Sequence, residues 1–457
     1  MAPALVPHSS HWGAFEAEVA DGTVVAIRPY RHDPDPSPLL GNIVDSLRHR
    51  ARITQPMIRA GWLDRGPGPD ARRGAEPFVP VSWTTANDLL ARELRRIYDR
   101  YGGESVYGGS YGWSSAGRFH HAQSQLHRFL NCLGGYVRGE HTYSNGAQSV
   151  IMPHVVGSMR EFLDRATAWS VLERHTELFV CFGGIPIKNT MVSPGGASRH
   201  PARDHLRAAR ARGAEFVLLS PLRDDLPGFV DAEWLPVVPG SDVAVMLALA
   251  FTLVDEALAD RAFLDGHCVG FARFERYLLG AADGCPKTPE WAERLSGIPA
   301  ATIRALARRM AARRTLINVN YSLQRVEHGE QAPWLAVTLA SMLGQIGLPG
   351  GDSARAMARS ATSAGRPCAW DRRRCHRGEP RARVHPLRPG GGHAAPSGRA
   401  VRLRRHAPRL SRDSSRVLVR RQPLPSPPAP RAAAPGTRPA ADDRRPRFVL
   451  DADGAPR

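Results

Sequence analysis

The segment from Tyr107 to Ser149 holds the residues of this chain that are best placed to do chemistry. It contains two glycine-rich turns, YGGSYGW at 107–113 and YSNG at 143–146. Because glycine lacks a Cβ, the backbone of such turns can approach a bulky ligand closely. The segment therefore predicts a cofactor pocket. The same spacing is also compatible with a strand–turn–helix–turn unit of an α/β sheet in which the aromatic residues are structural.

The elements around these turns follow from the apolar spacing. Residues 118–133 predict a helix that ends at Gly134-Gly135, residues 150–156 are strand- or turn-like, and residues 159–174 predict another amphipathic helix. Upstream, Ser82 predicts the start of a helix whose apolar residues recur every three to four positions up to Tyr101. We expect that helix to pack on a sheet.

A second group of polar residues follows predicted strands. The apolar run Leu178–Phe182 predicts a buried parallel strand that opens into GGIPIKN at 183–189. Strands are also predicted at 216–219, before SPLRD, at the start of VVPGSD (237–242), and at 315–319, before NYSLQRVEHGEQ. Helices are predicted at 203–212, 243–258, 299–313 and 334–347. Since ligands of open α/β sheets bind at the carboxyl ends of the strands, these turns predict a ligand site.

The N-terminal part predicts a different architecture. Residues 8–30 predict a small β-meander with strands at 15–19 and 23–27 around the turn Asp21-Gly22. Residues 37–70 are rich in loop signals and are expected to wrap around the rest. The fold class is therefore α/β and multi-domain, with a parallel-sheet domain and a small N-terminal meander.

The charge of the chain is concentrated at one end. The formal net charge is +19, but residues 355–457 contain 25 arginines and 7 acidic residues, so residues 1–354 are close to neutral. Basicity of this kind does not predict a nucleic-acid partner, because aromatic residues that could stack on bases are nearly absent from the basic part. The six cysteines form no CxxC pair, which argues against a zinc ribbon or an iron–sulfur cluster and favours buried free thiols.

No stretch near the N-terminus has the pattern of an export signal, and no apolar run reaches the roughly 18 residues of a membrane span. A cytoplasmic protein is expected, or a periplasmic one if the start of the chain is mis-assigned.

Several sequence motifs of the central segment resemble those of a known family. YGGSYGW, GGYV at 134–137, and YSNGA followed by VIMPHVVG are similar to the molybdopterin oxidoreductases, in particular the dimethyl sulfoxide, trimethylamine N-oxide and biotin sulfoxide reductase group. The resemblance implies that the oxygen of Ser144 ligates molybdenum, with Tyr111 and Trp113 beside the metal. A high-valent molybdenum favours an anionic oxygen ligand, and a phenol can donate a hydrogen bond to a substrate oxygen.

The resemblance also implies a cofactor of molybdenum held by two pterin guanine dinucleotides, without an iron–sulfur cluster. Tyr321 departs from the family pattern, which has tryptophan there. His11 and Trp12 are further candidates to face the site, and Arg59, Arg72 and Arg73 are candidates for phosphate contacts or for solvated surface residues. The residues carried over as cofactor contacts are Lys188, Asn189, Ser220, Arg223, Asp224, Asp242, Ser322, Gln324, Arg325, His328 and Gln331.

The resemblance covers residues 8–351, about the first half of a typical member. The predicted domains are the meander and wrapping segment at 1–60, a molybdenum-site region at 61–170, a dinucleotide-binding domain at 171–351 and a tail at 352–457. The tail is rich in arginine, proline and alanine and predicts disorder. A sequence of this composition is also what GC-rich DNA encodes when it is translated in a shifted reading frame.

The sequence thus predicts a molybdenum-dependent reductase that removes oxygen from an S-oxide or N-oxide. The electron donor is not given by the sequence. The alternative is a truncated, inactive remnant or scaffold with a basic tail, whose apolar surface is exposed where the family's second half would pack.

Overall fold

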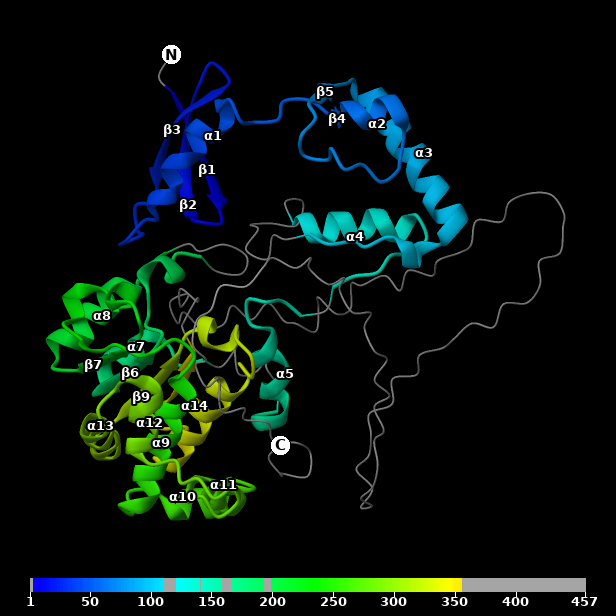
Figure 1. Ribbon diagram of the computed structural model, residues 1–457. Helices are drawn as coiled ribbons and strands as arrows, with labels where there is room; N and C mark the ends of the chain where they lie inside the picture. The colour runs from blue at the N-terminus through cyan, green and yellow to red at the C-terminus, as the bar shows by residue number, and fades with distance from the viewer. Residues whose placement is uncertain (1–2, 111–120, 140, 158–165, 193–198, 356–457) are drawn as a thin grey trace, which may run out of the picture. The chain divides into compact units, whose positions relative to one another are not determined.

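The computed structural model describes residues 3–110, 121–139, 141–157, 166–192 and 199–355 (Figure 1). All described residues belong to one compact unit, within residues 1–367. Among them, no helix has the length and apolar character that a membrane span requires.

The N-terminal residues form an antiparallel three-stranded sheet. Its strands are β1 (Ala4–Ser10), β2 (Gly13–Ala20) and β3 (Thr23–Pro29), in that order, with an irregularity in the register at Glu18/Val19. The predicted meander is confirmed, and β1 extends it toward the N-terminus. Its core is Phe15, Ala17 and Leu40, with Trp12 packed against them. The short helices η1 (Pro38–Gly41) and α1 (Asn42–Arg48) follow.

The next part of the chain, residues 57–157, is named here the linking segment. It contains a two-stranded sheet of β4 and β5, the helices α2, α3, α4 and α5, and the short helix η2. A parallel bridge joins Tyr107 to Val137. The bounds are β4 (Met57–Arg59), α2 (Ala60–Arg65), β5 (Phe78–Pro80), α3 (Trp83–Tyr101), η2 (Gly103–Ser105), α4 (Ala122–Cys132) and α5 (Gly146–Val155).

Two predictions in the linking segment are wrong. The stretch at 150–156, expected as strand or turn, is helical up to Val155 and belongs to α5, which contains Pro153. The helix that begins after Ser82 is present and capped by the Ser82 hydroxyl, which accepts a hydrogen bond from the N–H of Thr85 at 3.0 Å. However, α3 does not pack on the sheet as expected, because none of its 19 residues is buried.

The parallel-sheet domain spans residues 166–355. Its strands β6 (Leu178–Phe182), β7 (Glu215–Leu219), β8 (Glu233–Leu235), β9 (Thr315–Val319) and β10 (Asp352–Arg355) pair in the order β10-β9-β6-β7-β8, all parallel. Strands β6, β7 and β9 confirm the prediction.

The third strand was predicted to end at the start of VVPGSD (237–242), but it ends two residues earlier, at Leu235. It lies at 233–235, because Pro236 and Pro239 have no N–H to donate to a ladder. The first four residues of the predicted disordered tail form β10, so this part of the tail prediction is wrong too. The rest of the tail lies outside the described residues.

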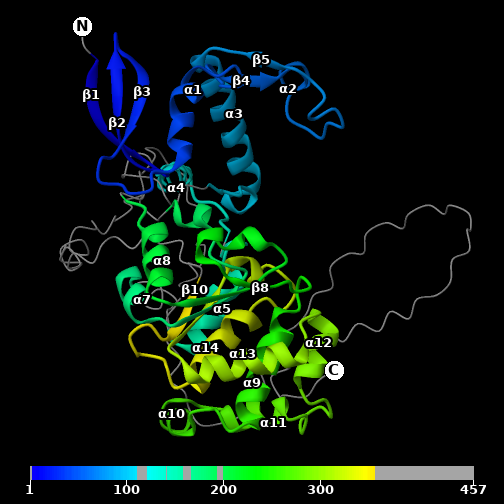
Figure 2. The ribbon, with the colours of Figure 1, turned by 90° about the vertical axis from the view of Figure 1, so that its left-hand side faces the viewer.

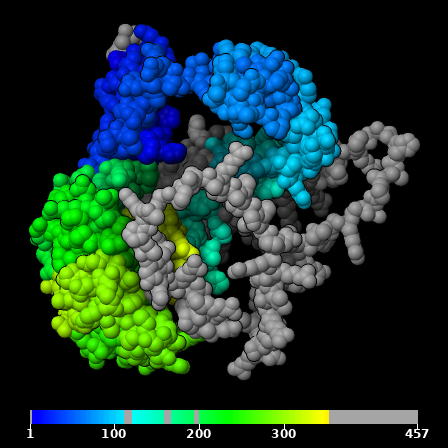
Figure 3. Space-filling model, in the orientation of Figure 1, coloured from blue at the N-terminus to red at the C-terminus, as the bar shows by residue number. Residues whose placement is uncertain are grey.

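Helices cover both faces of the sheet (Figure 2). On one face, α7 (Trp169–His175) and α8 (Ala202–Ala211) pack on Phe179, Phe216 and Leu316 of the strands. The alternate strand residues, such as Val180, Val217 and Ile317, are also fully buried and point to the other face. The helices α9 (Asp242–Asp255), α12 (Pro289–Ser296), α13 (Ala300–Ala312) and α14 (Gln331–Met342) pack together there. In the space-filling view these green and yellow segments form one packed body (Figure 3).

Two further helices complete the domain. The helices α10 (Arg261–His267) and α11 (Phe271–Leu278) follow α9. The predicted helix at 159–174 is described only from 166 onward, where it is α7. A buried pair ties the N-terminal part to this domain, since His200 Nδ1 lies 2.6 Å from Asp33 Oδ2 and the His200 N–H donates to Asp33 Oδ1 at 2.8 Å.

The described cysteines are all free, as expected, but only Cys181 is fully buried. Burial raises the pKa of its thiol. Cys132 is exposed, which corrects the expectation that the thiols are buried. Cys368 and Cys375 lie outside the described residues.

Candidate cofactor site

The strand order places a switch point between β6 and β9. From β6 the chain continues to β7 and β8 on one side and later returns to β9 and β10 on the other. The connections that leave neighbouring strands in opposite directions open a crevice at the carboxyl ends, where ligands of such sheets bind. The predicted site residues of GGIPIKN and NYSLQRVEHGEQ follow β6 and β9 directly, so they meet at this point.

The turn after β6 depends on two glycines. Gly183 and Gly184 have φ values of +72° and +73°, which side chains rarely adopt. A Cβ on Gly184 would lie 2.1 Å from the carbonyl oxygen of Asp225, and a Cβ on Gly183 would lie 2.8 Å from the Cβ of Asn320. Two asparagine side chains hold the turn, because Asn320 donates to Gly183 O and Asn318 to Gly184 O, each at 2.9 Å.

Lys188 and Asn189 lie just beyond this turn, in the short helix η4 (Ile187–Thr190). Lys188 is exposed and Asn189 half-buried. Lys188 forms no ion pair with any described acid, whereas Lys287, the only other lysine, is fully buried against Asp283 and the ring of Tyr277. Lys188 therefore has the exposure and the free charge that a contact to an anionic ligand requires.

The predicted residues after β7 divide into an internal group and an exposed group. Ser220 is buried and its hydroxyl donates to Asp225 Oδ2 at 2.6 Å, so it organises the turn itself. Arg223 and Asp224 are exposed in η5 (Arg223–Asp225), and the structure pairs neither with a described side chain. Because Asp225 also contacts Gly184, the turns after β6 and β7 touch.

Asp242 is the first residue of α9, one position before the predicted start of that helix. The side chain is half-buried, and this burial raises the pKa of its carboxyl to about 6. A carboxyl with this pKa can change its protonation state near neutral pH, and the helix N-terminus favours its charged form.

The residues after β9 divide in the same way. They begin in the short helix η7 (Tyr321–Gln324). Ser322 is exposed, and His328 has a left-handed backbone with φ of 56°. Gln331 is half-buried, and its N–H donates to the carbonyl oxygen of His328. Gln324 is buried, and with Arg325 it binds the backbone of the YSNG turn more than 170 residues upstream.

This contact brings Ser144 to the switch point of the sheet. The carbonyl oxygen of Ser144 accepts hydrogen bonds from Gln324 Nε2 at 2.9 Å and from two nitrogens of Arg325 at 3.3 Å. Ser144 itself is half-buried, and the turn leads into α5, whose Met152 is fully buried. The structure thus joins the predicted metal ligand to the predicted cofactor segment. Tyr111 and Trp113 lie outside the described residues.

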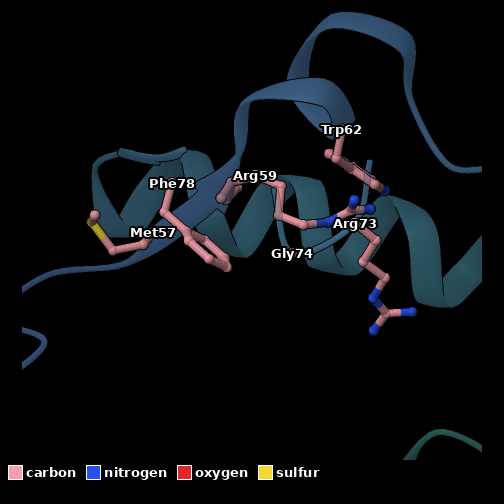
Figure 4. Close-up of a pocket in the computed structure, with 7 residues that line it drawn as sticks. Met57, Arg59, Trp62, Arg73, Gly74 and Phe78 are labelled. Atoms are coloured by element: carbon pink, nitrogen blue, oxygen red, sulfur yellow. The ribbon is translucent and has the colours of Figure 1, made fainter. Parts of the chain in front are cut away.

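A pocket of about 450 Å³ lies in the linking segment, between β4, β5 and α2. Met57 and Phe78 line one end, and Trp62 and Arg73 the other, with Arg59 between them (Figure 4). Arg59 pairs with Glu76 at 2.5 Å, and Arg72 lies 3.5 Å from Asp70. Of the three arginines singled out as phosphate candidates, only Arg73 has no described acidic partner.

Other functional candidates were missed by the sequence analysis. Asn318, Asn320 and Asp225 shape the turns at the switch point, yet none was singled out. Asn318 could have been found, because a polar residue inside the apolar strand TLINV needs a hydrogen-bond partner. His11 and Trp12 are half-buried, and the packing of Trp12 is within the N-terminal sheet.

Comparison with family models gives two matches. Residues 52–386 match the molybdopterin oxidoreductase model, and residues 8–48 match the molybdopterin oxidoreductase N-terminal domain. The larger match continues past Gly351, where the motif resemblance ends.

Several characterised proteins are similar in sequence. The chain is 45% identical to a dimethyl sulfoxide/trimethylamine N-oxide reductase of Rhodobacter capsulatus over 77% of this chain and 42% of the relative. It is 41% identical to a biotin sulfoxide reductase of Cereibacter sphaeroides, over 72% of this chain and 44% of the relative. A trimethylamine-N-oxide reductase of Haemophilus influenzae is 38% identical, over 75% of this chain and 42% of the relative. The chain thus spans less than half the length of these relatives.

One solved structure supports the fold. Acetylene hydratase from Pelobacter acetylenicus matches with a TM-score of 0.51 and 21% identity, over 74% of this chain and 42% of that structure. From the family models and the sequence relatives together, the chain belongs to the molybdopterin oxidoreductase family, in which it is similar to S-oxide and N-oxide reductases.

Proposed function

We propose that this chain belongs to a molybdenum-dependent reductase that removes oxygen from an S-oxide or N-oxide. The observation that carries the proposal is the attachment of the Ser144 turn to the switch point of the parallel sheet through Gln324 and Arg325. Relatives named as dimethyl sulfoxide, trimethylamine N-oxide and biotin sulfoxide reductases support the substrate class.

We propose that the cofactor is molybdenum with two pterin guanine dinucleotides and no iron–sulfur cluster. The donor set at the switch point fits an anionic, polar ligand. Lys188 and Arg223 are exposed cations on touching turns and have no described acidic partner. Ser322 adds an exposed hydroxyl, and Asp242 supplies a carboxyl that can accept hydrogen bonds from a guanine base.

The residues of the chain then take distinct roles. Ser144 supplies an oxygen ligand to the metal, and when bound the molybdenum supplies two-electron redox chemistry for oxygen removal. By the resemblance, Tyr111 would donate a hydrogen bond from its phenol to the substrate oxygen, and Trp113 would be the tryptophan beside the metal. Lys188, Asn189, Arg223 and Arg325 hold the dinucleotide, so that the substrate meets a fixed site.

The proposal is tested by activity. The full chain, produced in cells supplied with molybdate, is assayed with a reduced viologen dye and dimethyl sulfoxide, trimethylamine N-oxide or biotin sulfoxide. We expect reduction of at least one of these, and a loss of about 100-fold or more in Ser144→Ala. Ser149→Ala, in the first turn of α5 that follows the Ser144 turn, is the matched control and keeps the activity.

The absence of any activity in a molybdenum-loaded preparation contradicts the proposal. It favours the alternative, a truncated and inactive remnant. An active enzyme in which Ser144→Ala matches Ser149→Ala retains the reductase function but removes Ser144 as the ligand.

A further inference from the structure

Gln324 binds the Ser144 turn with both halves of its amide group. Its Oε1 accepts a hydrogen bond from the backbone N–H of Ala147 at 3.0 Å. Its Nε2 donates to the carbonyl oxygens of Ser144 at 2.9 Å and Tyr143 at 3.2 Å, and it also contacts the carbonyl oxygen of Tyr321 at 3.1 Å. The side chain is only 5% exposed, so little water competes for these bonds.

The bond to Ala147 satisfies a group that the helix cannot satisfy itself. Ala147 lies in the first turn of α5, where backbone N–H groups have no partner inside the helix. The cap residue Asn145 does not fill this role, because its side chain pairs with the hydroxyl of Thr142 at 3.1 Å. Gln324 therefore caps α5 from a position 177 residues away in the chain.

The other end of this connection is fixed to the sheet. The N–H of Asn320 donates to the carbonyl oxygen of Phe182, the last residue of β6, at 2.9 Å, and the Asn320 side chain donates to Gly183 O. Asn320 is followed directly by η7, which contains Gln324. The switch point is thus joined to the backbone of Ser144 by the hydrogen bonds of Asn320, the short stretch of chain in η7 and the hydrogen bonds of Gln324.

We propose that Gln324 is a positioning residue that fixes the Ser144 turn to the switch point of the sheet. The inference rests on the proposed function, in which Ser144 is the metal ligand, and assigns Gln324 to the ligand-bearing turn instead of to the cofactor. Both N–H groups of its amide are already engaged by backbone carbonyl oxygens. A side chain that is both donor and acceptor is required, because the turn presents both kinds of backbone group.

Three variants separate this role from general stability. Gln324→Met keeps the length of the side chain and removes its hydrogen bonds, while Gln324→Glu keeps an acceptor for Ala147 and removes the donor. Gln345→Met is the matched control. Gln345 is 8% exposed and also bonds one backbone N–H and one carbonyl, those of Thr315 and Arg313, but at the opposite end of β9.

The first measurement is hydrogen exchange of the full chain without cofactor, read on a peptide covering 143–149. We expect exchange about tenfold faster in Gln324→Met, the effect of losing one buried hydrogen bond. Gln324→Glu retains protection at Ala147, and Gln345→Met leaves this peptide unchanged. Equal exchange in Gln324→Met and the unsubstituted chain overturns the proposal, as does an equal acceleration in Gln345→Met.

The second measurement is the molybdenum X-ray absorption spectrum of the loaded protein. We expect the spectra of both Gln324 variants to move toward that of Ser144→Ala, whereas Gln345→Met keeps the original spectrum. If Ser144→Ala itself keeps the original spectrum, Ser144 is not the ligand and the proposed function fails at that point. The exchange measurement still decides whether Gln324 holds the turn, so the two failures are distinguishable.

Discussion

The parallel-sheet domain and the linking segment differ in how far their apolar residues are buried. In the domain, every residue of β6 and β9 is buried, and so are nine of the fourteen residues of α9. In the linking segment, α3 buries none of its residues, and its Trp83 and Leu90 are 70% and 52% exposed. Phe78, Phe129 and Tyr143 are exposed as well.

The parallel-sheet domain is stabilised by its own core, whereas the linking segment depends on contacts with that domain. The domain has a continuous core on both faces of its sheet. Ser144, in contrast, lies in the linking segment, and its turn reaches the domain through Gln324, Arg325 and the buried face of α5. We therefore expect substitutions in the domain to change folding stability strongly, and substitutions in the linking segment to change it little.

The largest effect is expected at Gly184. In Gly184→Ala the new methyl group would collide with the backbone of Asp225, and φ is +73°. We expect the free energy of unfolding to fall by more than about 4 kcal/mol, measured by urea titration. Gly135→Ala in the linking segment is the control, since φ is +102° but the space is open, and it should cost about 1 kcal/mol. Equal losses of stability in the two variants would contradict the expected difference between the domain and the linking segment.

A pair of leucines tests the contrast directly. Leu206 in α8 is fully buried, whereas Leu90 in α3 is half exposed. We expect Leu206→Ala to lower the free energy of unfolding by about 2–5 kcal/mol and Leu90→Ala by less than about 0.5 kcal/mol. If Leu90→Ala destabilises the chain as much as Leu206→Ala, α3 packs on a surface in solution and the linking segment is not loosely held.

The same contrast explains which parts of the fold were predictable. Strands β6, β7 and β9 are short runs of apolar residues buried on both faces, so their local sequence is sufficient. Helix α5 was predicted as strand or turn because its Val, Ile and Pro residues oppose a helix locally. It is helical where Gln324 caps its first turn and α14 packs against it, and neither contact is visible in the local sequence.

The candidate site was predictable to a similar extent. The turns with glycine pairs and polar residues after buried strands meet at the switch point, because parallel strands bring their carboxyl ends to one edge. That they bind a cofactor stays a prediction. The roles of the residues there were less accessible. Ser220 and Gln324 look like ligand contacts in the sequence, yet their polar groups are bonded to Asp225 and to the Ser144 turn. Such partners depend on tertiary contacts.

Asp242 provides a pH-dependent prediction. Burial raises its pKa from about 3.8 in the unfolded chain to about 6, so the folded state binds the proton more tightly. Its contribution to stability is most favourable below about pH 4 and is lost as pH rises to about 6. We expect Asp242→Asn to be more stable than the unsubstituted chain at pH 7.5, by about 1–3 kcal/mol, and equally stable at pH 4. A constant difference across this range would contradict the assignment.

The smallest effect on stability is expected at Lys188. Lys188→Met should change the free energy of unfolding by less than about 0.5 kcal/mol, because the side chain is exposed and unpaired with any described acid. Lys287→Met, at the buried ion pair with Asp283, should cost at least about 2 kcal/mol. The same chemical change would then separate a lysine available to a ligand from a structural one. A large stability loss in Lys188→Met would remove it from the cofactor site.

We expect this chain to hold molybdenum through its own residues. The most direct test is the molybdenum content of the purified full chain, by mass spectrometry, after expression with abundant molybdate. We expect close to one molybdenum per chain, and a clear reduction in Lys188→Met and Ser144→Ala but not in Ser149→Ala. A chain that is folded by circular dichroism and contains no molybdenum would contradict the account.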